Sequence, residues 1–217
     1  MKRRILIGAL ASLALLGVVA FAFGPPKVPA EAIQSSVTRS ENLLDRAWSL
    51  PAAATDARKL DWQSNGSLCG PASVANVFRS LGEAADTEDE VLAGTGKCGL
   101  GFCFMGLTLD ELAEVAQAHT QRKVTVLRGI TAEEFREHLR ASNDPARRYI
   151  VNFTRDKIFG AGAGHHSPIG GYLEAEDLVL VLDVNEDFRP WLVERSRLFA
   201  AMDTQDGDRK RGLLLIE

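Results

Sequence analysis

A cysteine, a histidine and an aspartate, far apart in the sequence, most constrain how this chain can fold. Cys69 stands at the start of a predicted helix, whereas His165 and Asp183 lie much later, among predicted strands. A fold that joins these side chains must pack the beginning of a helix against the ends of two strands. We therefore expect an α+β domain, with a helical half that carries the cysteine packed on an antiparallel sheet that carries the histidine and the acid.

The pattern of apolar residues locates these elements. Ala72, Ala75, Phe78 and Leu81 recur every three residues and predict a helix over 69–81, which Gly82 would end. Thr-x-x-Glu capping boxes predict two more helices, after Thr108 and Thr131. A short helix is expected over 40–48. Strands are expected over 124–127, 149–153, 167–172, 178–184 and 212–216.

Cys69 is a candidate nucleophile because the N-terminus of a helix favours negative charge. The pKa of its thiol should lie below the usual value of about 8.5. His165 would accept the thiol proton and later donate it to the leaving group, and Asp183 would orient the imidazole. Gln63, six residues earlier than the cysteine, would donate a hydrogen bond to the oxyanion. The competing interpretation of a lone cysteine is a small buried hydrophobic residue.

Several segments resemble one known family. The run from Gly164 to Tyr172 reads GHHSPIGGY, and Leu178 to Val184 reads LVLVLDV. Together with the residues around Cys69 and the Arg211-Gly212 ending, these resemble the phytochelatin synthase family, a papain-like clan of glutathione γ-glutamylcysteinyltransferases. The resemblance implies a papain-like cysteine proteinase fold.

The resemblance also assigns roles to single residues. It identifies His165 as the catalytic histidine; His166, next to it on a strand, would then point to the opposite face, away from Cys69. It implies that Asp206 and Arg211 bind the amine and the carboxylate of a γ-glutamyl group, although a surface salt bridge would explain the same pair. Gly164 ends a glycine-rich stretch that would let a small substrate approach the backbone closely.

The activity implied is thiol acyl transfer on glutathione. Cys69 would attack the Cys–Gly amide, release glycine and hold a γ-Glu-Cys thioester, which water or a second glutathione would resolve. Glu186 stands where the family has an arginine on the second-substrate side, so hydrolysis is expected to dominate. The alternatives are a papain-like peptidase that processes a peptide leader and a non-catalytic thiol- or metal-binding module.

Few cofactors or partners are expected besides glutathione and related γ-glutamyl thiols. The histidines and cysteines lack the spacing of a zinc site, so no tightly bound metal is predicted. Heavy-metal ions such as Cd or Zn are implied by the family only as a metal–thiolate substrate or activator. The formal net charge is −4 and no basic stripe occurs, which argues against nucleic acid as a partner.

The N-terminus has the pattern of a targeting segment. Lys2, Arg3 and Arg4 precede an apolar stretch from Ile5 to Phe23, which fits a signal peptide or a retained membrane anchor. We therefore expect 1–24 to be this segment, 25–55 a linker with a short helix, and 56–217 a single catalytic domain. The domain would lie in the periplasm or on the periplasmic side of the inner membrane.

The three cysteines of the chain add a constraint on its redox state. In an oxidising compartment, Cys98 and Cys103 could form a bridge and leave Cys69 free. Glycines between Cys98 and Cys103 would allow such a tight loop. The alternative is a loop with two unpaired thiols.

Overall fold

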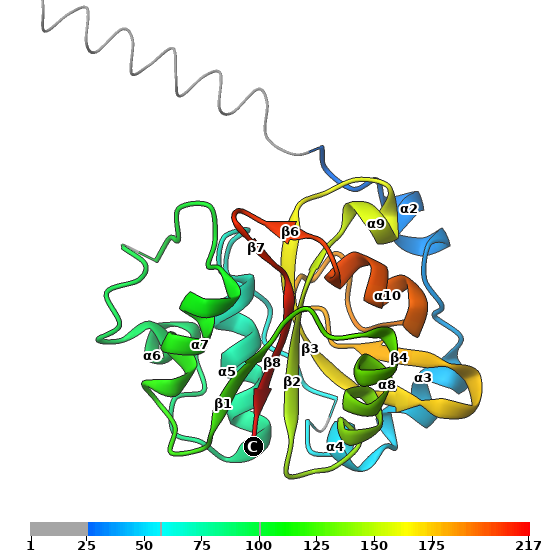
Figure 1. Cartoon of the computed structure of the whole chain (residues 1–217), viewed down its shortest axis with the longest axis horizontal. Coiled ribbons are helices and arrows are strands. Elements are labelled where there is room, and N and C mark those ends of the chain that lie inside the picture. The colour runs from blue at the N-terminus through cyan, green and yellow to red at the C-terminus, as the bar shows by residue number, and fades with distance from the viewer. Residues whose placement is uncertain (1–25, 57, 100) are drawn as a thin grey trace, which may run out of the picture.

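The structure is a computed structural model that describes residues 26–56, 58–99 and 101–217. Its centre is a six-stranded antiparallel sheet with helices on both faces (Figure 1). The expected targeting segment, 1–24, lies outside the described residues. Within the described residues, every helix is too short or too polar to cross a membrane.

The sheet has the strand order β1-β8-β2-β3-β4-β5, and a separate hairpin is formed by β6 and β7. The C-terminal strand β8 therefore lies inside the sheet, between β1 and β2. The strands are β1 Val124–Leu127, β2 Arg148–Thr154, β3 Gly164–Leu173, β4 Leu178–Val181, β5 Trp191–Glu194, β6 Gln205–Asp206, β7 Arg209–Lys210 and β8 Gly212–Ile216.

Different helices cover the two faces of this sheet. The described helices are α2 Ala30–Ser35, α3 Glu41–Trp48, α4 Pro51–Ala54, α5 Cys69–Leu81, α6 Glu88–Leu92, α7 Leu109–Gln117, α8 Ala132–Ala141, α9 Asp156–Phe159 and α10 Arg195–Met202, with a 3₁₀ turn at Glu174–Glu176. Helices α5 and α7 lie against one face, and α8 and α10 lie against the other (Figure 1).

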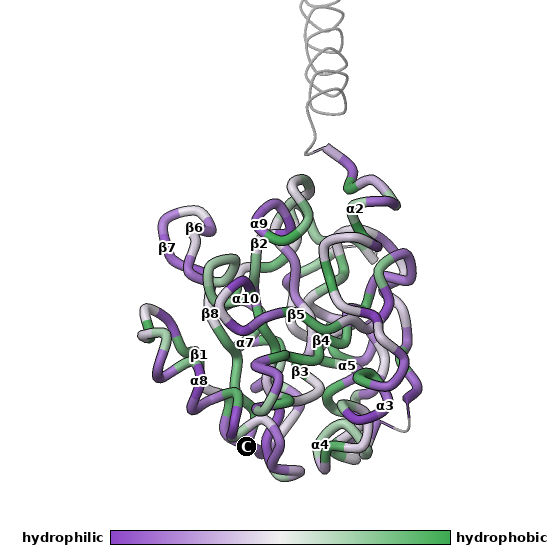
Figure 2. The backbone as a smooth tube through the Cα atoms, turned by 90° about the vertical axis from the view of Figure 1, so that its right-hand side faces the viewer, coloured by the Kyte–Doolittle hydropathy of each residue, from purple (hydrophilic) through white to green (hydrophobic). Residues whose placement is uncertain are grey.

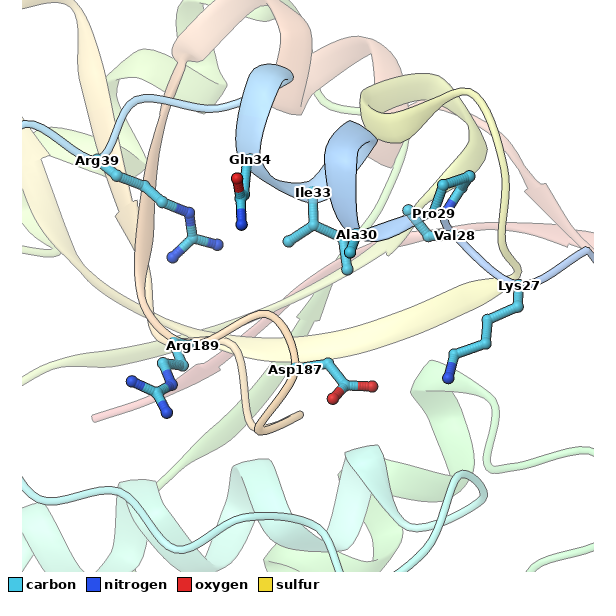
Figure 3. Close-up of a pocket in the computed structure, with 9 residues that line it drawn as sticks. All are labelled: Lys27, Val28, Pro29, Ala30, Ile33, Gln34, Arg39, Asp187 and Arg189. Carbon is cyan, nitrogen blue, oxygen red and sulfur yellow. The ribbon is translucent and has the colours of Figure 1, made fainter.

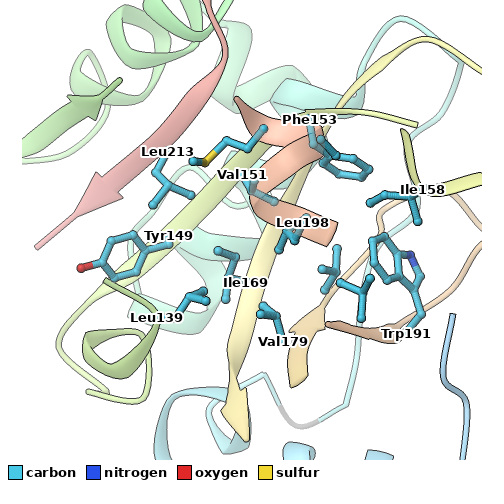
Figure 4. Packing of buried hydrophobic residues seen from close by; sticks show 14 of the residues in the cluster. Leu139, Tyr149, Val151, Phe153, Ile158, Ile169, Val179, Trp191, Leu198 and Leu213 are labelled. Atoms are coloured by element: carbon cyan, nitrogen blue, oxygen red, sulfur yellow. The ribbon is translucent and has the colours of Figure 1, made fainter. Parts of the chain in front are cut away.

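Alternation along β2 produces two apolar cores. Ile150 packs with α5 and α7, whereas Tyr149, Val151 and Phe153 point to the opposite face. Figure 4 shows this second core, in which Trp191 and Leu198 close over the sheet from β5 and α10. Figure 2 shows the hydropathy of the residues along the chain, with apolar central strands and a hydrophilic β6–β7 hairpin. Strands β2, β4 and β8 are therefore buried on both faces, which explains their continuous apolar runs.

The local signals for the helices are confirmed. Helix α5 begins at Cys69 and ends before Gly82, which takes the left-handed conformation with φ of 72° that a glycine tolerates. Thr108 and Thr131 each cap a helix through the expected reciprocal bonds with a glutamate three residues later. These signals depend on neighbouring residues alone, so they are readable without knowledge of the tertiary structure.

Other segments differ from the expectation. Strand β4 ends at Val181, so Asp183 follows the strand instead of ending it. The short helices α2, α4, α6 and α9, the helix α10 and the strands β5, β6 and β7 were not predicted. Residues 26–55 are packed on the domain, because Val28, Ile33 and Ala47 are buried and Thr38 pairs with Leu192 of β5. The expected helix within this segment is present as α3, but the rest does not behave as a linker.

Candidate active site

Cys69 lies at the first residue of α5, where it faces the start of β3. Its side chain is buried and packs with Ala72 and Val184. The Sγ atom lies 3.9 Å from Nδ1 of His166. Burial would raise the pKa of the Cys69 thiol, but the charge of His165 and hydrogen bonds with His165 and His166 outweigh it and lower that pKa well below its ordinary value. The site therefore favours a thiolate.

His165 is held by Asp183. Its Nε2 atom lies 2.9 Å from Oδ1 of Asp183, and both side chains are almost fully buried. Burial and the nearby charge of Arg155 disfavour a protonated ring, but Asp183 and Cys69 outweigh them and raise the pKa of His165. Because Nε2 is engaged by the carboxylate, the other ring nitrogen is available for proton transfer. An imidazolium is thus stabilised beside the thiolate.

The two histidines are not equivalent, although both act on the thiol. In the pairing of β2 with β3, His165 lies opposite Phe153 and His166 lies opposite Asn152, so their side chains leave the strand on opposite faces. His166 faces α5 and Cys69, which differs from the expectation that it would point away. Its Nε2 atom is buried and has no hydrogen-bond partner in the described structure.

Asp183 is surrounded by donors. Arg155 donates to both carboxylate oxygens, at 2.8 and 2.9 Å, and the backbone N–H of Asn185 donates to Oδ1 at 3.0 Å. The indole N–H of Trp191 donates to Oδ2 at 3.3 Å. Burial alone would raise the pKa of Asp183, but the charges of His165 and Arg155 lower it, so the acid stays ionised.

Gln63 is tied to the same strand end. Its backbone N–H donates to the carbonyl oxygen of Val184 at 2.8 Å, next to Asp183. Its side-chain Nε2 donates to the carbonyl oxygen of Asn65 at 2.8 Å, and its Oε1 is buried without a partner in the described structure. The glutamine therefore borders the same hollow as His165, but its amide is occupied within its own loop.

Two hollows meet beside these residues. The first, which we call the Arg211 hollow, has a volume of about 530 Å³ and is lined by Cys69, His166, Asp206 and Arg211. The second, the Lys27 hollow, has a volume of about 340 Å³ and adjoins the first. It is lined by Lys27, Gln63, Arg155, His165, Asn185 and Asp187, among others. Gly66, Ala163 and Gly164 border both hollows.

Comparison with known proteins identifies the family. The profile of the phytochelatin synthase family matches residues 102–213, about half of the chain. The chain belongs to this family. The match covers His165, Asp183 and Arg211, whereas Gln63 and Cys69 precede it. The family match therefore does not test Cys69 as a nucleophile, and the case for this residue rests on the geometry described above.

Curated relatives agree with this assignment. Glutathione gamma-glutamylcysteinyltransferase from Schizosaccharomyces pombe is 27% identical over 117 residues, which are 52% of this chain and 28% of that protein. Glutathione gamma-glutamylcysteinyltransferase 2 from Arabidopsis thaliana is 36% identical over 90 residues, which are 40% of this chain and 20% of that protein. The chain thus spans less than a third of the length of these curated relatives.

The solved structures confirm the papain-like fold. A protein from Bacillus anthracis described as a C39-like peptidase superposes with a TM-score of 0.55 and 14% identity over 75% of this chain and 95% of its own. The peptidase domain of Streptococcus ComA, a bi-functional ABC transporter, superposes with a TM-score of 0.50 and 16% identity. The match covers 73% of this chain and 96% of that domain. At these identities the likeness concerns the fold alone.

Asp206 and Arg211, which were predicted to bind the substrate, lie together in the structure. Nη2 of Arg211 lies 3.1 Å from Oδ1 of Asp206, and Asn152 joins both, accepting from Arg211 at 2.7 Å and donating to Asp206 at 2.9 Å. A side chain at Gly164 would overlap the guanidinium of Arg211. Gly164 therefore leaves room for the arginine, and its expected contact with a substrate stays a prediction.

Two contributors were missed from the sequence. Asn152 lies within an apolar strand, and Arg155 follows that strand immediately; neither belongs to a recognisable motif. Arg155 also stacks on the ring of Phe188, 3.4 Å from its centroid. Within the described residues, no group of three His, Cys, Asp or Glu side chains is arranged to hold a metal ion.

A disulfide-closed loop forms one wall of the Arg211 hollow. Cys98 and Cys103 are joined, which leaves Cys69 as the free cysteine. The backbone N–H of Cys103 donates to Oγ of Ser67 at 3.1 Å, two residues before the thiol. Phe102, which lines the hollow, is more than half exposed. The loop thus supports the segment that carries Cys69.

Replacing Arg155 by methionine should destabilise the protein by about 3 kcal/mol, because one partner of a buried ion pair is left uncompensated. Arg155 is 7% exposed, and Asp183 is fully buried. The free energy of unfolding from urea titration measures this change. As a control, Arg46→Met removes the surface partner of Glu176 and should change the midpoint little. Equal midpoints for both variants would contradict the assigned role.

Proposed function

We propose that this protein is a thiol acyltransferase that cleaves the Cys–Gly bond of glutathione through a γ-Glu-Cys thioester on Cys69. The observation that carries the proposal is the buried thiol beside the His165–Asp183 pair in a member of the phytochelatin synthase family. The names of the curated relatives, glutathione gamma-glutamylcysteinyltransferases, support the choice of substrate.

The reaction begins with attack of the Cys69 thiolate on the carbonyl carbon between cysteine and glycine. The C–N bond then breaks, and His165 gives its proton to the departing amine of glycine. Asp183 stays ionised and holds the imidazole in place during both transfers. Water or the amine of a second glutathione attacks the thioester, returns a proton to His165, and releases γ-Glu-Cys or its longer conjugate.

The Arg211 hollow is the better site for the acyl part of the substrate. Asp206 and Arg211 together match the α-amine and α-carboxylate of a γ-glutamyl group. Asn152 holds both side chains, so that the pair is pre-organised before a substrate arrives. An enzyme using this site would accept the γ-glutamyl head of glutathione and related thiols.

The oxyanion would be stabilised by the backbone N–H of Cys69 and by the side chain of Gln63. Since Nε2 of Gln63 now donates to Asn65, the amide must exchange that acceptor for the substrate oxygen. Heavy-metal ions enter this scheme only as part of a metal–thiolate substrate or as activators. Hydrolysis is expected to exceed transfer, because Glu186 occupies the family's arginine position.

Mass spectrometry of the products from glutathione tests the proposal. We expect free glycine and γ-Glu-Cys from the wild-type protein, with longer γ-Glu-Cys oligomers as a minor product that Cd²⁺ increases. A peptide of the same length that begins with an α-linked glutamate is the matched control and should not be cleaved. Cleavage of the α-linked peptide without release of glycine from glutathione would instead indicate a peptidase.

A further inference from the structure

The Lys27 hollow lies where the leaving group of the proposed reaction must depart. It is lined by Gln63 and His165, and it meets the Arg211 hollow at Gly66, Ala163 and Gly164. If the γ-glutamyl head occupies the Arg211 hollow, the residue after the scissile bond extends past His165 into the Lys27 hollow. This direction follows from the lining of the two hollows, because Cys69 borders the Arg211 hollow and His165 borders the Lys27 hollow.

Besides His165, two side chains that carry a positive charge line the Lys27 hollow, and they differ in their ion pairs. Arg155 is bonded to both oxygens of Asp183, so its charge is compensated. Lys27 is exposed and forms no ion pair within the described part of the chain. Figure 3 shows its ammonium group and the carboxylate of Asp187 facing each other across the adjoining cavity, which they also line. Lys27 is therefore the cation available to an anionic ligand.

The backbone next to Lys27 is held firmly against the site. Val28 is only 7% exposed and belongs to the same apolar core as Phe153 and Trp191. Gly162, with φ of 100°, allows this approach, because a side chain there would lie 2.9 Å from both Val28 and Arg155. The anchor of Lys27 is thus set by packing, whereas its side chain remains free to reach into the hollow.

We propose that Lys27 determines specificity by binding the free carboxylate of the residue that leaves, the glycine of glutathione. This inference rests on the proposed function and names its leaving-group side. The preferred substrates are then γ-Glu-Cys peptides with one further residue and a free C-terminal carboxylate. Asp187, on the opposite side, disfavours a second negative charge in the leaving residue.

The experiment compares glutathione with its glycinamide analogue, γ-Glu-Cys-Gly-NH₂, by the rate of γ-Glu-Cys formation, a product common to both. In the wild type, kcat/KM should be about fivefold higher for glutathione, as expected for an exposed ion pair. In Lys27→Met the preference should disappear through loss of glutathione turnover alone. Lys123→Met, which changes an exposed lysine that lines neither hollow, should retain the preference. Asp187→Asn should increase the preference for glutathione over the glycinamide analogue.

The outcomes separate this inference from the function beneath it. If the wild type forms no γ-Glu-Cys from either compound, the proposed function is wrong. If it cleaves both but the preference is absent, or persists unchanged in Lys27→Met, the role of Lys27 is overturned while the function stands. A Lys27→Met variant that loses turnover of both compounds equally would also overturn the role in carboxylate recognition.

Discussion

Replacing Cys69 with alanine should reduce glycine release from glutathione by about 10⁴-fold or more, because no other group can hold the acyl intermediate. Cys98 and Cys103 are joined to each other and cannot replace it. The variant should fold normally, since the side chain of Cys69 packs with only Ala72 and Val184 in its cluster. Activity is measured by mass spectrometry of glycine, and the urea midpoint controls for folding.

The same thiol gives an independent readout in the wild type. Because the pKa of Cys69 is lowered, the thiolate persists as the pH falls below the range in which an ordinary thiol is protonated. Iodoacetamide should therefore alkylate Cys69 faster than free glutathione at about pH 6. Cys69 is the free cysteine, so the adduct is assigned without ambiguity. An alkylation profile that matches that of glutathione would contradict an activated nucleophile.

Replacing His165 with asparagine should lower glycine release by about 10³-fold, through loss of both proton transfers. The matched change, His166→Asn, should cost less than about tenfold, because within the described residues Nε2 of His166 has no partner equivalent to Asp183. Figure 4 shows Phe153, the neighbour whose ring contacts His165 edge-on at 5.7 Å. In His165→Asn the smaller side chain thus fills part of the space of the imidazole, and the surrounding core stays intact.

The alkylation profile again separates the two histidines. Since the charge of His165 lowers the pKa of the thiol, its loss should raise that pKa and move the profile toward higher pH. In His166→Asn the profile should move less. If His166→Asn causes the larger loss of both activity and thiolate, then the ring 3.9 Å from the sulfur is the base, and the assignment of His165 is wrong.

Features set by neighbouring residues could be predicted from the sequence. The helix that begins at Cys69, the two capping boxes and the strands at 124–127 and 212–216 depend on local spacing, and each is present. The triad order and the Asp206–Arg211 pair followed from a resemblance in short motifs. His165 contacts Asp183 and Arg211 contacts Asp206 in the structure, although contact alone does not establish the roles of these residues.

Features set by tertiary packing could not be predicted. Arg155 reaches Asp183 only because β2 and β4 flank β3 and end at the same edge of the sheet, which no local pattern records. Asn152 reads as an ordinary strand residue until the β6–β7 hairpin brings Asp206 beside it. Likewise, the packing of Val28 depends on a missing side chain at Gly162, far along the chain.

The pairing of Arg155 with Asp183 has a consequence for the energetics of the proton shared by sulfur and imidazole. The guanidinium and the carboxylate cancel, so the buried centre holds no net charge apart from Cys69 and His165. Moving one proton from the thiol of Cys69 to the imidazole of His165 converts two neutral groups into a pair of opposite charges. The net charge of the buried centre does not change. The proton transfer therefore leaves no isolated ion in this interior.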